Sequence, residues 1–94
     1  MDQVDPVIVV NGDYSNEYKL NDEISIHSMS VTDNVDAAET LVKVIYIIAS
    51  DGTMHRVNAG DSYKFKAYGT FTIRYFSYDA SGNIALLDYK LNVQ

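Results

Sequence analysis

The sequence from Gly69 to Val93, GTFTIRYFSYDASGNIALLDYKLNV, predicts a β-hairpin. Small or polar residues alternate with large ones over Thr70–Tyr78 and again over Ile84–Val93, which is the two-residue period of a β-strand. The loop Asp79–Asn83 contains Gly and Asn, which adopt positive φ readily, and Asp, which accepts hydrogen bonds from nearby backbone N–H groups. We therefore expect two antiparallel strands joined by this loop.

One register of the hairpin produces favourable cross-strand pairs. It places Ser77 opposite Ala85. The pairs on one face are then Tyr78 with Ile84, Phe76 with Leu86, and Arg74 with Asp88. Such pairs contribute roughly 0.2–1 kcal/mol each. The other face has the composition expected of a core, with Phe71, Ile73, Tyr75, Leu87, Tyr89, Leu91 and Val93.

Shorter segments with strand character precede the hairpin. They are Pro6–Val10, Glu23–Thr32, Leu41–Ala49, Met54–Val57 and Ser62–Lys66. Turn residues separate them at intervals of roughly eight to twelve residues, which is the spacing of all-β sandwiches. The sequence therefore predicts an all-β, antiparallel β-sandwich of about seven strands, with residues 1–94 forming a single domain.

Two of these segments raise the question of which side chains face the core. In Glu23–Thr32 the apolar residues change parity, and a β-bulge near His27 and Ser28 would bring them back to one side. In Leu41–Ala49 we expect Lys43 to face solvent, together with Ile45 and Ile47 on the same outer face. The core side of this central strand would then carry Val42, Val44, Tyr46 and Ile48.

Composition and charge narrow the range of functions. The chain has no Cys, which removes disulfides and thiolate metal sites, and a net charge of −6, which argues against nucleic-acid binding. The longest apolar run, Val44–Ala49, is too short to cross a bilayer, so no membrane insertion is expected. No signal peptide opens the sequence. Either the protein is intracellular, or Met1 begins one module of a longer exported chain, and we favour the second interpretation.

Three motifs occur in order along the chain: VTDNVD at Val31–Asp36, GTFTIRY at Gly69–Tyr75 and YDASGN at Tyr78–Asn83. With the Pro-x-Ile start at Pro6, they resemble bacterial immunoglobulin-like domains of group 3 and hyalin-repeat-like modules. The resemblance implies an immunoglobulin-like antiparallel β-sandwich of about seven strands. It also implies a non-catalytic module of bacterial surface or secreted proteins, located outside the cell. Such a module acts as a spacer or docking unit and packs against neighbouring domains of its chain.

The chain departs from the family pattern at two residue positions and in the 50–60 region, which is longer and more polar than the family pattern leads us to expect. Phe71 stands where the family commonly has Tyr, and Asp36 is followed by Ala37 and Ala38 where the family usually continues with Gly. The second departure changes a turn that would otherwise support an ion site.

Oxygen-rich loops raise calcium as an alternative ligand. The candidate ligands are Asp33, Asn34, Asp36 and Asp79. Ca²⁺ takes roughly six to eight converging oxygens, whereas capping of local turns explains each of these residues separately. No cofactor is therefore expected. His27 and His55 lack the spacing of zinc ligands, and the chain has neither a G-x-S-x-G motif nor Cys, so we expect no enzyme.

The sharpest functional feature is an apolar patch on the face predicted to be exposed. Its members are Ile45, Ile47, Phe76, Tyr78, Ile84 and Leu86. Contiguous exposed apolar area above a few hundred Å² marks interaction surfaces. If Asp13–Asp22 or the Ala37-Ala38 turn covers the patch, the module is a spacer. If the patch is bare, it binds a protein or a glycan as an adhesive module. A decoration domain of a phage or virion is a third alternative.

Overall fold

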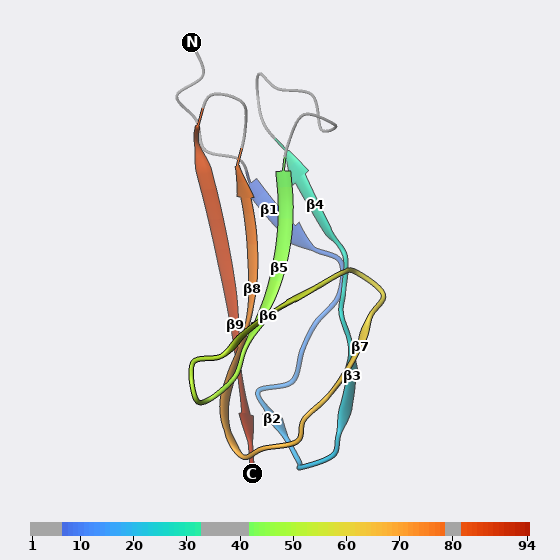
Figure 1. Cartoon of the computed structure of the whole chain (residues 1–94). Helices are drawn as coiled ribbons and strands as arrows, with labels where there is room; N and C mark the ends of the chain where they lie inside the picture. The colour runs from blue at the N-terminus through green and yellow to red at the C-terminus, as the bar shows by residue number, and fades with distance from the viewer. Residues whose placement is uncertain (1–6, 33–41, 79–81) are drawn as a thin grey trace.

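The computed structural model describes residues 7–32, 42–78 and 82–94 (Figure 1). These residues form β-strands joined by turns and loops, without a helix. The strands are β1 (Val7–Val10), β2 (Glu17–Tyr18), β3 (Glu23–Ser25), β4 (Met29–Thr32), β5 (Val42–Ile48), β6 (Met54–Val57), β7 (Ser62–Lys64), β8 (Gly69–Tyr78) and β9 (Ile84–Val93). The all-β prediction is confirmed for the described ranges, and no helix in them is long and apolar enough to cross a membrane.

The predicted hairpin is the centre of the larger sheet. β8 and β9 pair antiparallel in the expected register, with Ser77 opposite Ala85 and Arg74 opposite Asp88. The sheet has the strand order β2-β9-β8-β5-β6. β2 runs parallel to β9, with Tyr18 beside Val93, whereas the other described strand pairs of this sheet are antiparallel. The long hairpin therefore supplies the inner strands on which the short strands are assembled.

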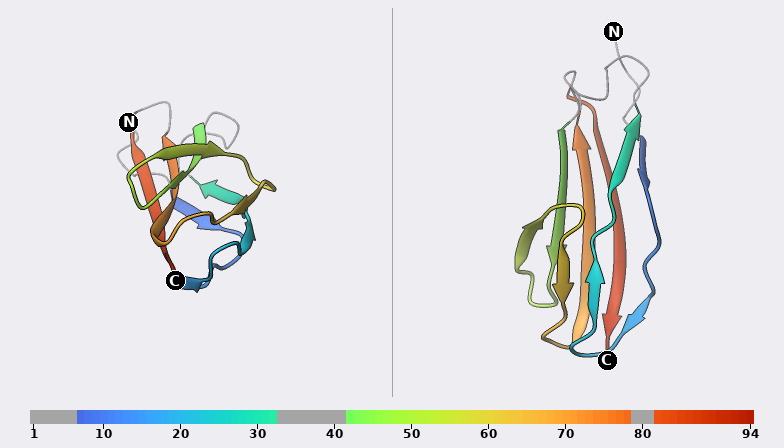
Figure 2. Two further views of the ribbon diagram at one scale, coloured as in Figure 1. Left: turned by 60° about the horizontal axis from the view of Figure 1, so that its bottom comes forward. Right: turned by 90° about the vertical axis from the view of Figure 1, so that its right-hand side faces the viewer.

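A second layer covers one face of this sheet (Figure 2). It consists of two antiparallel pairs, β1 with β4 and β3 with β7. Because β3 and β4 follow each other along the chain, the two pairs lie one after the other along the long axis of the molecule (Figure 1). The molecule measures 47 × 22 × 18 Å.

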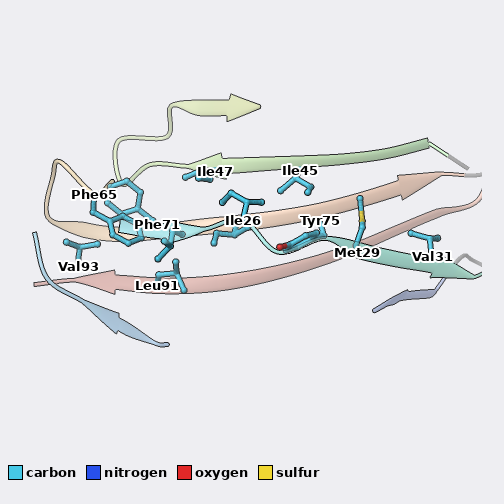
Figure 3. Close-up of a cluster of buried hydrophobic side chains, with 12 residues drawn as sticks. Ile26, Met29, Val31, Ile45, Ile47, Phe65, Phe71, Tyr75, Leu91 and Val93 are labelled. Atoms are coloured by element: carbon cyan, nitrogen blue, oxygen red, sulfur yellow. The ribbon is translucent and has the colours of Figure 1, made fainter. Parts of the chain in front are cut away.

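The core lies between the two layers (Figure 3). Its fully buried side chains include Phe65, Phe71, Ile73, Tyr75 and Leu91. Phe65 packs edge-on against Phe71, with ring centroids 5.1 Å apart. The predicted core face of the hairpin is thus confirmed, since its alternate residues point into this layer.

The second layer changes pairing partner at Ile26–Ser28. Ile26 still hydrogen-bonds to the segment that leads into β7, because its N–H donates to the Asp61 carbonyl at 2.8 Å. The predicted change of parity is present, since Ile24, Ile26, Met29 and Val31 are all buried. The predicted bulge is wrong in form: the strand ends and a new strand begins, because β3 and β4 pair with different neighbours.

A tyrosine network holds this break in place. The buried Tyr75 hydroxyl donates to the His27 carbonyl at 2.8 Å and lies 2.7 Å from the Tyr14 hydroxyl. The His27 N–H donates to the Tyr14 hydroxyl at 2.9 Å. Burial, followed by the hydrogen bond with Tyr14, raises the pKa of Tyr75 well above its usual value, so the hydroxyl stays protonated. The segment after β1 is therefore fixed to both layers.

Gly12 permits a close approach within this network. Its φ is +150°, and a Cβ at this position would lie 2.7 Å from the His27 ring. The His27 ring packs on Tyr14 at a centroid distance of 4.7 Å, and its Nε2 lies 2.9 Å from the Asp13 carbonyl. A side chain at position 12 would therefore displace a ring that is held on both sides.

The predicted orientation of β5 is wrong. Ile45 and Ile47 are 6% and 0% exposed and belong to the core, so the interaction patch does not include them. Lys43 lies on the same, inner face of β5 as Ile45 and Ile47, opposite Ser77 of β8. Lys43 is nevertheless exposed, since it stands near the start of the strand beside a recess of about 170 Å³. The long side chain of a lysine near a strand end can reach solvent from the inner face. The exposure of Lys43 therefore does not indicate which face of β5 is the outer face.

The tight turns follow the sequence prediction. At Ser50–Thr53 the Asp51 carboxylate accepts a hydrogen bond from the Thr53 N–H at 2.9 Å, which lowers the pKa of Asp51. At Asn58–Asp61 the Asp61 carboxylate accepts one from the Asn58 N–H at 2.8 Å. The Ala37-Ala38 turn, considered above as a possible cover of the patch, lies outside the described residues.

Candidate docking surface

The outer face of the larger sheet is the side of β5, β6, β8 and β9 that points away from the second layer. The strand registers arrange its side chains in rows that cross the sheet. We call two of them the apolar rows: Ile84–Tyr78–Val42 and Leu86–Phe76–Val44. The next row, here the charged row, is Asp88–Arg74–Tyr46–Arg56.

The apolar rows are exposed to solvent. Ile84 and Leu86 are each 52% exposed, Tyr78 is 41% exposed and Val42 is 37% exposed. Phe76 is half-buried against Tyr78, with ring centroids 5.8 Å apart. Large apolar side chains next to one another in water are the feature that distinguishes a docking surface from a scattered surface leucine.

A shallow depression of about 500 Å³ lies over the apolar rows and the charged row. Its walls come from β5, β6, β8 and β9, and they include Val44, Tyr46, Met54, Arg56, Phe76 and Leu86. The depression therefore has an apolar floor and two guanidinium groups, Arg56 and Arg74, along one side.

Among the described residues, the charged row has one ion pair and one cation outside it. Arg74 donates from Nε and Nη2 to the two carboxylate oxygens of Asp88, both at 2.9 Å. This hydrogen bonding raises the pKa of Arg74. The predicted Arg74–Asp88 pairing is thus confirmed. Arg56 is exposed and forms no ion pair with any other described residue. The row consequently carries a negative group at β9 and, at β6, a positive group without an ion-pair partner in residues 7–32, 42–78 and 82–94.

The structure brings together four of the six residues predicted for the patch. Phe76, Tyr78, Ile84 and Leu86 lie on the outer face, whereas Ile45 and Ile47 lie in the core. The sequence interpretation missed the neighbours from β5 and β6, namely Val42, Val44, Tyr46, Met54 and Arg56. Pairing β5 beside β8 in antiparallel register, with Ile47 opposite the core residue Ile73, would have identified the three residues of β5. Pairing β6 beside β5 would then have identified Met54 and Arg56.

The remaining candidates do not form a site in the described part of the chain. Asp33, Asn34, Asp36 and Asp79 lie outside it. Over residues 7–32, 42–78 and 82–94, no three His, Cys, Asp or Glu side chains are grouped to hold a metal. His27 belongs to the tyrosine network, and His55 is exposed on β6.

Comparison with known proteins returned no family model, no curated protein and no solved structure that matches the chain.

Proposed function

We propose that the chain is a non-catalytic, immunoglobulin-like module that docks another protein through its outer face. The strand arrangement supports the immunoglobulin-like assignment. Immunoglobulin-type sandwiches pack two mainly antiparallel sheets and extend the sheet containing their last two strands. Here the last two strands, β8 and β9, lie inside the sheet β2-β9-β8-β5-β6, and the first part of the chain is divided between both layers.

The apolar rows are the observation that carries the docking role. Exposed Ile84, Leu86, Tyr78 and Val42 stand on adjacent strands of one sheet, and none of them contributes to the core. An isolated module that only spaced its neighbours would gain nothing from this apolar surface in water, and would be more prone to aggregate. A docking partner removes the same surface from water.

The shape of the module suits a place in a longer chain. β1 begins toward one end of the 47 Å long axis, and β9 ends at the other (Figure 1). Modules of this geometry add length when they are joined in series, so spacing and docking are compatible roles. The location in a bacterial surface or secreted protein rests on the sequence motifs alone.

A glycan is the second candidate ligand. Phe76 and Tyr78 offer ring faces, and the neighbouring Arg74 and Asp88 offer polar groups for hydroxyls. However, Arg74 and Asp88 already satisfy each other through two hydrogen bonds. The apolar rows also extend beyond the rings of Phe76 and Tyr78 to the aliphatic side chains on either side. This aliphatic surface suits a protein partner better than a glycan.

The double substitution I84T/L86T tests whether the apolar rows are bare. Both side chains are half-exposed, so we expect the free energy of unfolding to change by less than about 1 kcal/mol, as for most surface substitutions. Thr retains the strand preference of the sites. We expect the wild-type chain to bind an anionic apolar dye, such as anilinonaphthalene sulfonate, and the variant to lose most of this binding.

The control is V7T/V9T, which changes two exposed apolar residues of the other layer. We expect this variant to bind the dye as the wild-type chain does. If I84T/L86T cost more than about 2 kcal/mol and the wild-type chain bound no dye, the rows would be covered, and the docking role would be wrong.

A further inference from the structure

We propose that the partner on the outer face is a second copy of this chain, packed face to face about a two-fold axis that runs parallel to the strands. This inference rests on the proposed docking function. It uses an additional observation, the asymmetry of the charged row. Two-fold interfaces are formed by one surface patch that complements itself.

The charged row meets this requirement. Its order across the sheet is Asp88 on β9, Arg74 on β8, Tyr46 on β5 and Arg56 on β6. An axis parallel to the strands and midway between β8 and β5 exchanges the two sides of the sheet. Asp88 of one copy then faces Arg56 of the second copy, and the reverse contact forms by symmetry. Arg74 of one copy faces the ring of Tyr46 of the other, a favourable arrangement for a guanidinium group.

The same axis matches the apolar rows by size. Tyr78 of one copy faces Val42 of the second copy, and Phe76 faces Val44, because the paired strands exchange places. Large side chains opposite small ones interdigitate when sheets pack face to face, about 10 Å apart. β6 ends at Val57 and pairs with β5 no further than Ile45, so Ile84 and Leu86 extend past the end of β6 in the second copy.

The size and charge of the face indicate a weak complex. At about 4.8 Å between strands and about 3.3 Å per residue, three strands over seven residues and β6 over its four residues cover a projected area of about 400 Å² per copy. Interfaces of this size are typical of transient complexes. This face carries the positive charges of Arg56, Arg74 and Lys90 and the negative charge of Asp88, so its net charge is positive. Two copies of the face therefore repel each other, which weakens their association. We therefore expect dissociation constants in the upper micromolar range.

Charge reversal tests the partner and the axis together. In sedimentation equilibrium up to about 1 mM, where weak complexes of this size are populated, the wild-type chain is expected to dimerise. R56E and D88R, each alone, place like charges opposite each other, and we expect each to weaken association by at least about tenfold. An equimolar mixture of the two variants restores both contacts in a heterodimer. We expect the mixture to associate within about threefold of the wild-type chain.

The control is K66E, which makes the same charge change as R56E at an exposed residue outside the outer face. It is expected to leave dimerisation unchanged. D88R also removes the partner of Arg74, so circular dichroism must show that it is folded. If D88R is not folded, the comparison of dimerisation between R56E and K66E alone tests the two-fold arrangement.

A wild-type chain that is monomeric at about 1 mM would overturn the second copy as the partner. The docking face itself would still stand if dye binding is lost in I84T/L86T, and a different protein or a glycan would then be the ligand. Dimerisation that R56E and K66E affect equally would overturn the two-fold arrangement.

Discussion

Replacement of Ile47 by Ala is expected to lower the free energy of unfolding by about 2–5 kcal/mol. Ile47 is fully buried on β5, opposite the equally buried Ile73 of β8. The substitution removes three carbon atoms from the middle of the core and leaves a cavity that the sheet on one side and the second layer on the other cannot close. Because domains of this size are stable by only about 5–15 kcal/mol, the loss is a large fraction of the total. Urea denaturation followed by circular dichroism measures it.

The matched control is I84A, the same chemical change at a residue that is 52% exposed on the outer face of the same sheet. We expect it to cost about 1 kcal/mol or less, mainly through the lower strand preference of Ala. The difference between the two variants reports the orientation of β5. Equal costs would contradict it, because Ile47 would then have to point outward, as the sequence alone suggested.

Replacement of Tyr75 by Phe is expected to cost about 1–3 kcal/mol, although it removes a single oxygen atom. The Tyr75 hydroxyl is buried, donates to the His27 carbonyl and lies within hydrogen-bond distance of the Tyr14 hydroxyl. Without it, the carbonyl at the break between β3 and β4 loses its donor inside the protein. We expect the midpoint of thermal unfolding to fall accordingly.

The control for this prediction is Y89F. Tyr89 packs against both Tyr75 and Tyr14, and its hydroxyl has no hydrogen bond within the described ranges. Its replacement by Phe should therefore change the unfolding free energy by only a few tenths of a kcal/mol. If Y75F and Y89F had the same effect, the network would not stabilise the break.

The hairpin could be predicted in detail because its information is local. Alternation over β8 and β9 fixes the two faces, and the short loop fixes the register. The Arg74–Asp88 pair adds an independent constraint on the same register, and the structure contains it with two hydrogen bonds. Four of the six residues of the apolar rows follow directly, because Phe76, Tyr78, Ile84 and Leu86 are placed by this register.

The face of β5 could not be predicted from its own sequence. The strand is apolar on both sides, so alternation does not separate the inner face from the outer one. Lys43 was the only charged residue available as a guide, and it is exposed from the inner side near the strand end. The decision is made by packing instead: Ile45 and Ile47 are the side chains opposite Tyr75 and Ile73.

The break between β3 and β4 depends on contacts that are distant in sequence. The change of apolar parity after Ile26 was visible in the sequence and correctly implied an irregularity. Its form depends on Tyr14 and Tyr75, which reach the break from the segment after β1 and from β8. No local pattern near residue 27 could indicate them.

Solvent access to individual methyl groups tests whether the apolar rows are a bare surface, separate from the core. The measurement is the relaxation of Ile, Leu and Val methyl signals by a soluble paramagnetic compound, made at low concentration where the chain is monomeric. We predict strong relaxation for Ile84, Leu86 and Val42, and little for Ile45 and Ile47. Equal protection of Ile84, Leu86 and Ile47 would contradict the claim, because the outer face would then be covered within the monomer.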